Sequence, residues 1–129
     1  MLHHVDVHVR ELDRARQLFE AIAEYAGYRA RASDPDDEAD FAGYEPVNGG
    51  RPRIGFIADG AVAAGSIRIA FSAASRADVD AAAQAARARG ARSMEGPSLH
   101  PEYGDDYYAV FFEDDDGNRY EILAPTENA

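Results

Sequence analysis

The chain has 129 residues, 46% hydrophobic and 29% charged, a composition typical of one soluble globular domain. It contains no cysteine, which excludes disulfides, thiolate metal ligands and cysteine nucleophiles. Its 24 Asp and Glu outweigh 13 Arg, with no Lys, and the net charge of −11 argues against nucleic acid or an anionic membrane as a partner. Without a secretory signal or an apolar run long enough to span a bilayer, the chain is expected to be cytoplasmic.

The first two predicted elements are a strand and a helix. Residues 3–9 alternate in polarity, which predicts a half-buried strand with His4, Asp6 and His8 on one face and His3 on the other. Apolar residues recur at helical spacing over residues 11–26. Gly27 then follows as a residue that commonly ends a helix.

The middle of the chain is predicted to form strands around polar loops, with a loop at 34–38 and a turn at 48–50. A second helix is expected from the Ser75–Asp78 capping box to Arg89. A proline-bearing loop follows at 96–104, and Asp114 to Gly117 has the composition of a hairpin turn. Further strands are expected over residues 39–44, 53–58, 67–72, 106–113 and 118–124.

These elements form two copies of the same order, a strand, a helix and then several strands, offset by about 64 residues. The sequence therefore predicts one domain built of two modules, over about residues 1–62 and 63–129. If each helix covers one face of the sheet, the His4 face is shared with Arg68 of the second module.

Two stretches of the chain, residues 4–19 and 107–122, resemble the vicinal oxygen chelate superfamily, which contains glyoxalase I, bleomycin- and fosfomycin-resistance proteins and extradiol dioxygenases. The second stretch is similar to the aromatic strand, turn and terminal glutamate of that family, with Asp115 where the family has proline. The resemblance implies an α+β fold of two βαβββ modules. These would form a curved mixed sheet with helices on the convex face, the site on the concave face, and a homodimer.

The resemblance also implies a metal site for some members, which would hold one divalent ion such as Zn, Ni, Fe or Mn. His4 falls on the first histidine position and Glu121 on the terminal carboxylate, but the second histidine position is Arg68, which cannot donate a lone pair. His8 lies about 13 Å along the strand from His4, too far to share one ion. His100 lies on a loop from which it could turn inward.

Three functions are compatible with these residues. The favoured one is a metal-independent cleft for a small molecule in which Arg68 neutralises Glu121 or holds an anionic ligand, and the protein either sequesters that ligand or uses Glu121 as a base beside His4. The alternative is a metal-dependent lyase or dioxygenase with His4, Glu121 and an unassigned third ligand. A structural role is the third.

The candidate ligand-binding residues are Arg68, His8, Tyr103 and Tyr108. Aromatic residues are frequent in this part of the chain and could line a cleft for an aromatic or amphipathic ligand. Most strand aromatics are core residues, so at least three of the five are expected to be buried. The five are Tyr103, Tyr107, Tyr108, Phe111 and Phe112.

Overall fold

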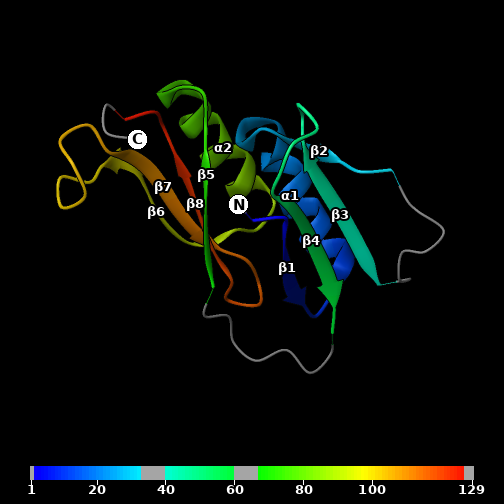
Figure 1. The fold of residues 1–129 in the computed structure, drawn as a ribbon. Coiled ribbons are helices and arrows are strands. Elements are labelled where there is room, and N and C mark those ends of the chain that lie inside the picture. The colour runs from blue at the N-terminus through cyan, green and yellow to red at the C-terminus, as the bar shows by residue number, and fades with distance from the viewer. Residues whose placement is uncertain (1, 33–39, 60–66, 127–129) are drawn as a thin grey trace.

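The computed structural model describes residues 2–32, 40–59 and 67–126. Two four-stranded sheets lie on either side of two helices (Figure 1). In chain order the elements are β1 (His4–Val9), α1 (Leu12–Ala26), β2 (Tyr28–Ala30), β3 (Phe41–Pro46), β4 (Arg53–Ala58), β5 (Arg68–Ser72), α2 (Arg76–Ala88), β6 (Arg92–Leu99), β7 (Tyr108–Glu113) and β8 (Arg119–Leu123).

The two sheets have the same topology. Sheet A has the strand order β1-β4-β3-β2 and sheet B has the order β5-β8-β7-β6. In each sheet the module's first and last strands pair in parallel, while the remaining neighbours pair antiparallel. The predicted α+β fold of two βαβββ units is therefore confirmed. The expected module boundary near residue 62 and the expected loop at 34–38 lie outside the described residues.

The helix ends follow the predicted signals. Gly27 takes a left-handed conformation with φ of 80° and donates its N–H to the Ala23 carbonyl. The Ser75 hydroxyl accepts a hydrogen bond from the Asp78 N–H at 3.1 Å, which caps the first turn of α2. Neither of the described helices is long and apolar enough to cross a membrane.

The prediction of a loop over residues 96–104 was wrong in part, because β6 extends to Leu99. The strand contains Gly96 with φ of +88°, and its pairing with β7 shifts register twice. Such irregular pairing breaks the period-two pattern by which a strand is detected in a sequence.

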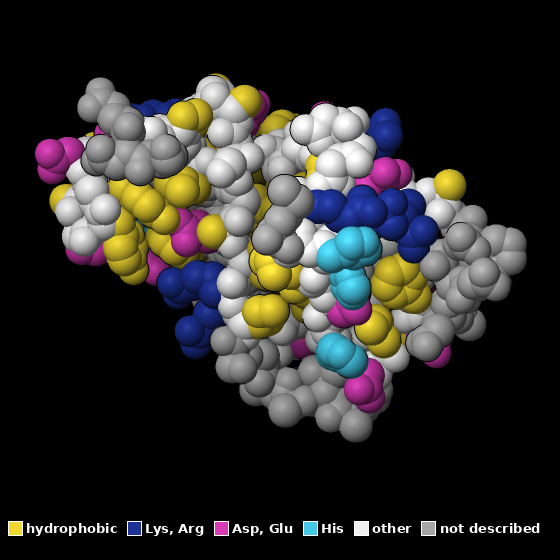
Figure 2. Space-filling model, viewed as in Figure 1, with side chains coloured by type: hydrophobic (Ala, Val, Ile, Leu, Met, Phe, Trp, Pro, Cys, Tyr) yellow, Lys and Arg dark blue, Asp and Glu magenta, His cyan; other side chains and the backbone are white. Residues whose placement is uncertain are grey.

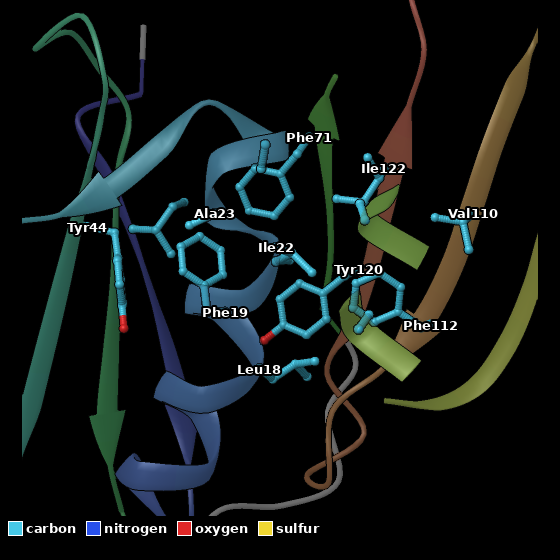
Figure 3. Packing of buried hydrophobic residues seen from close by; sticks show 14 of the residues in the cluster. Leu18, Phe19, Ile22, Ala23, Tyr44, Phe71, Val110, Phe112, Tyr120 and Ile122 are labelled. Atoms are coloured by element: carbon cyan, nitrogen blue, oxygen red, sulfur yellow. The ribbon is translucent and has the colours of Figure 1, made fainter. Parts of the chain in front are cut away.

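The core lies between the two sheets and is filled mainly by the helices (Figure 3). The ring of Phe19 on α1 lies 4.6 Å from Tyr44 of sheet A and 5.7 Å from Phe71 of sheet B, measured between ring centroids. Ile22 and Val79, one from each helix, are almost completely buried. The helix-covered faces of both sheets therefore share one core, and the opposite face of each sheet points away from it.

The β7–β8 turn also joins the two modules. Asn118 donates its side-chain N–H both to the Asp114 carboxylate and to the His8 carbonyl on β1. Arg10, just after β1, forms a 3.0 Å ion pair with Asp116 of the same turn. The predicted hairpin turn is thus confirmed, and it fixes the end of β1 against the second module.

Candidate functional site

Most of the predicted site residues lie on the outer faces of the two sheets, because the helices cover the other faces. His4 and His8 are exposed on β1, and Arg68 and Ala70 are exposed on β5. Figure 2 shows histidine and arginine side chains side by side over sheet A, and hydrophobic side chains with acidic and basic ones over sheet B.

The sheet A hollow is a depression of about 230 Å³ on the outer face of that sheet. β1 and β4 form its floor, where His4 is paired in register with Arg53 and Asp6 with Gly55. Its lining residues are His3, His4, Asp6, Arg31, Phe41, Gly43, Tyr44, Arg53, Ile54 and Gly55.

Arginine makes this hollow electropositive beside a pair of histidines. The Nδ1 atoms of His3 and His4 lie 3.0 Å apart, and His4 Nε2 lies 3.4 Å from the Asp6 carboxylate. The positive charge of Arg51 is the main cause that lowers the pKa of His3, with burial, His4 and Arg53 adding to it. The expectation that His3 faces away from His4 was wrong, because β1 begins at His4 and the alternation of a strand does not extend to His3.

Two glycines in sheet A leave room for neighbouring side chains to lie across the strands. A Cβ at Gly55 would stand 2.4 Å from the Asp6 carboxylate and 2.6 Å from the Phe41 ring. A Cβ at Gly43 would stand 3.0 Å from both Phe41 and the Arg31 guanidinium. The floor of the hollow therefore depends on the absence of side chains at these positions.

The sheet B cluster comprises Arg68, His100, Tyr103, Tyr107, Phe111 and Glu121. The register places Glu121 beside Ala70 on β5 and beside Phe111 on β7, so these residues share one face. Glu121 is only 5% exposed, and its carboxylate accepts a hydrogen bond from the Tyr107 hydroxyl. The Arg68 guanidinium lies over the Phe111 ring, 5.3 Å from its centroid.

The environment of Tyr107 keeps its phenol protonated. Burial, followed by the hydrogen bond to Glu121, raises the pKa of Tyr107 to about 12, although the charge of Arg68 opposes the shift. His100 is buried beside this pair, with its ring edge-on to Phe111 at 4.9 Å. The cluster thus combines an anionic acceptor, a cation and an aromatic surface on one sheet face.

Three predicted residues make their side-chain contacts with partners other than Glu121. Arg68 forms no ion pair with Glu121 within the described part of the chain and instead lies over an aromatic ring. Tyr108 points to the helix side, where its hydroxyl bonds to Asp80 of α2. His8 lies 3.5 Å from the Asp59 carboxylate.

The expectation that at least three of the five aromatic residues are buried was also wrong. Phe112 is buried, whereas Tyr107, Tyr108 and Phe111 are partly exposed and Tyr103 is 58% exposed. For Tyr103, Tyr107 and Phe111, the physical reason is that, among the described residues, no helix covers the outer face of sheet B.

The structure brings Arg68 and Glu121 onto one face, but it places His4 on the other sheet. Among the described residues, those that line the sheet A hollow with His4 all come from the first module. Tyr103 joins the Glu121 side, since its ring centroid lies 5.2 Å from that of Tyr107. The candidate residues therefore form two separate half-sites within the chain.

The donor set at the implied metal positions is incomplete. Gly55 is the third residue of β4, in register with Asp6, just as Glu121 is the third residue of β8, in register with Ala70. The first module therefore has glycine where the second has its carboxylate, and Arg68 stands at the second histidine position. No three His, Asp or Glu side chains come together as ligands in the part of the chain that the structure describes. These residues do not fit the metal site that the resemblance implies.

Sequence reasoning did not single out Arg53 or Phe41 as site residues, and it named Tyr107 only among the aromatics. Tyr107 precedes β7, so no alternation marks the direction of its side chain. Arg53 could have been found from the parallel pairing of β1 with β4, which sets it beside His4.

Comparisons with known proteins agree with this fold. No curated protein matches the chain. A candidate glyoxalase from Bacillus halodurans is 28% identical, with a TM-score of 0.73 over 97% of this chain and 96% of that one. A glyoxalase/bleomycin resistance protein from Albidiferax ferrireducens T118 is 22% identical, with a TM-score of 0.76 over 97% and 98%. TnmS3 from Streptomyces sp. CB03234 is 21% identical, with a TM-score of 0.67 over 98% and 96%.

The family model of the Glyoxalase/Bleomycin resistance protein/Dioxygenase superfamily matches residues 1–122, nearly the whole chain. The two βαβββ units and the sequence match point to the same conclusion. The chain belongs to the glyoxalase/bleomycin resistance protein/dioxygenase superfamily.

Proposed function

We propose that this protein binds a small organic molecule, without a metal, in a composite site between two copies of the chain. The sheet B cluster is the observation that carries this proposal. A nearly buried carboxylate held by Tyr107, with Arg68 lying over Phe111, forms a polar and aromatic surface that faces away from the core. Ligand sites commonly combine apolar walls with a few oriented polar groups in this way.

Two copies are proposed because each chain carries two incomplete half-sites. The sheet A hollow, at about 230 Å³, is smaller than the roughly 300–1,000 Å³ pockets that enclose a drug-sized ligand. A second copy with its sheet B over this hollow would set Arg68 and Glu121 opposite His4. In a two-fold dimer this arrangement forms twice, because each chain supplies both halves.

The residues of sheet B favour binding over metal chemistry. Arg68 carries a permanent positive charge that repels a divalent ion and attracts an anionic group. The Phe111 ring and Tyr103 offer stacking surfaces to an aromatic ligand. TnmS3, which has this fold, is described as an antibiotic binding protein. We therefore infer that sequestration of a small molecule is the role that this site supports best.

Fluorescence of 8-anilinonaphthalene-1-sulfonate, an aromatic anion, tests the site. The Arg68→Gln variant should bind the dye about tenfold more weakly than the original chain, since one charge-assisted contact is lost. Arg119→Gln is the matched control, because Arg119 lies on the same face but already pairs with Glu113 at 3.6 Å. Equal binding by both variants, or a protein that stays monomeric in light scattering, would contradict the proposal.

Metal analysis tests the proposal that the site works without a metal ion. Protein purified from medium supplemented with Zn, Ni, Fe and Mn should contain far less than one equivalent of any of them. Its melting temperature should not change when these ions are added. One tightly bound ion per chain that is lost in the His4→Ala variant would instead establish the metal-dependent alternative.

A further inference from the structure

We infer that the sheet A hollow is an anion subsite in which Arg53 binds the acid group of a small planar organic acid. The hollow brings arginine, histidine and an aromatic ring together on the floor formed by β1 and β4. None of these groups is needed for the core, which lies on the opposite side of the sheet.

Within the described residues, the positive charge of Arg53 has no acidic partner. Its Nε atom is buried and finds no hydrogen-bond partner among those residues. Among the described residues Arg53 forms no ion pair, and the nearby Asp6 carboxylate lies beside His4 at 3.4 Å. A chain with a net charge of −11 has many carboxylates that could neutralise an arginine, yet none of those that the structure describes pairs with this guanidinium. A buried N–H without a partner is unfavourable, and an acceptor that displaces the atoms covering it would relieve that cost.

Arginine dominates the local charge around the hollow among the described residues. Arg53 lines the hollow, and Arg51 is close enough to act electrostatically on the neighbouring His3. Asp6 is the one acidic residue that lines it in the described part of the chain. The patch of arginine and histidine is visible over sheet A in Figure 2. An anion is therefore attracted here even though the molecule as a whole is acidic.

An aromatic ring shapes the floor of the hollow. The Phe41 ring lies over Gly55, and the Arg31 guanidinium lies 5.8 Å from the centroid of that ring. A planar acid that lies beside this ring and the Arg31 guanidinium can set its carboxylate against the planar guanidinium of Arg53, the geometry that arginine binds best. The volume of about 230 Å³ suits the acid end of a ligand or a single substituted ring.

The inference deepens the proposed function and rests on it in one respect, namely that the rest of the ligand lies against sheet B of a second copy. The contact between the acid group and Arg53 needs sheet A alone. The Arg53 subsite and the composite site between two copies can therefore be refuted separately.

Benzoate and its neutral analogue benzamide are suitable probes, followed by NMR chemical-shift titration of the full chain. Benzoate should bind in the millimolar range and shift the amide signals of β1 and β4, and benzamide should bind at least about tenfold more weakly. Arg53→Gln should remove this preference. Arg29→Gln is the matched control, since Arg29 lies on the same sheet and pairs with Glu45 at 3.9 Å. Arg53→Lys keeps the charge without the guanidinium and should show an intermediate preference.

Equal binding of benzoate and benzamide would overturn the inference, and so would a preference for benzoate that survives in Arg53→Gln. Absence of benzoate binding would overturn it too. If Arg53→Gln does not fold, the outcome for Arg53→Lys decides, since an unchanged preference there rejects recognition by the guanidinium. A preference that depends on Arg53 in a protein that proves monomeric would support the subsite and contradict the composite site.

Discussion

The hydrogen bond between Tyr107 and Glu121 gives the sharpest stability prediction. The Tyr107→Phe variant keeps the ring but removes the hydroxyl that donates a hydrogen bond to the Glu121 carboxylate. Glu121 is 5% exposed, so water replaces the lost donor only in part. Leaving a buried acceptor without its partner costs about 1–3 kcal/mol of unfolding free energy. For a chain of this length that corresponds to a fall in melting temperature of about 3–15 °C.

Two further variants separate the hydrogen bond from other effects. Glu121→Gln keeps a neutral acceptor for Tyr107 and should cost less, about 0.5–1.5 kcal/mol. Arg68→Gln should cost less than 1 kcal/mol, since an exposed cation–aromatic contact is worth about 0.5–1 kcal/mol.

Chemical denaturation of these variants, together with the double variant Tyr107→Phe/Glu121→Gln, would measure the coupling between the two side chains. The effects should be clearly non-additive. Additive effects, or a melting temperature that Tyr107→Phe does not change, would refute the reasoning. A larger loss for Arg68→Gln than for Tyr107→Phe would instead support a direct Arg68–Glu121 pair.

The remaining predictions concern the turn, the second helix and pH. Asp114→Asn should destabilise the chain by about 1–4 kcal/mol in urea unfolding, because the new amide would face two buried donors, one of them the Tyr120 hydroxyl. Ser75→Ala should cost about 0.5–2 kcal/mol by calorimetry, because the Asp78 N–H loses its cap. The ultraviolet difference titration of the original chain against Tyr107→Phe should show one phenol with a pKa of about 12. Because folding raises this pKa, the protonated Tyr107 contributes its full stabilisation of the folded chain below about pH 10. That contribution is lost as the pH rises from about 10 through about 12.

Most of the fold was predictable because its signals are local. The alternation of residues 4–9, the cap at Ser75 and the left-handed glycine at Gly27 depend on neighbouring residues alone. The repeat of these signals after about 64 residues then identified the two modules. β6 was missed in part because Gly96 and the shifted pairing remove the local signal.

The candidate site was only partly predictable because it depends on contacts between distant segments. The pairing of β5 with β8 brings Arg68 and Glu121 to one face, as the resemblance implied. The contact of Arg68 with the Phe111 ring depends on side-chain packing, which a sequence pattern does not predict. Tyr108 was assigned to the ligand-binding residues by composition, yet its place in β7 turns it toward α2. The position of His4 relative to Glu121 depends on how whole sheets are arranged, which residue spacing does not determine.

Cysteine cross-linking between two copies tests the central claim directly, because the chain has no cysteine of its own. A tagged chain with His4→Cys and an untagged chain with Ala70→Cys, mixed and oxidised, should give a covalent heterodimer. Pairing His4→Cys with Glu24→Cys on the exposed side of α1 should give none. If sheet A of one copy does not face sheet B of another, the first mixture will give no more covalent dimer than the second.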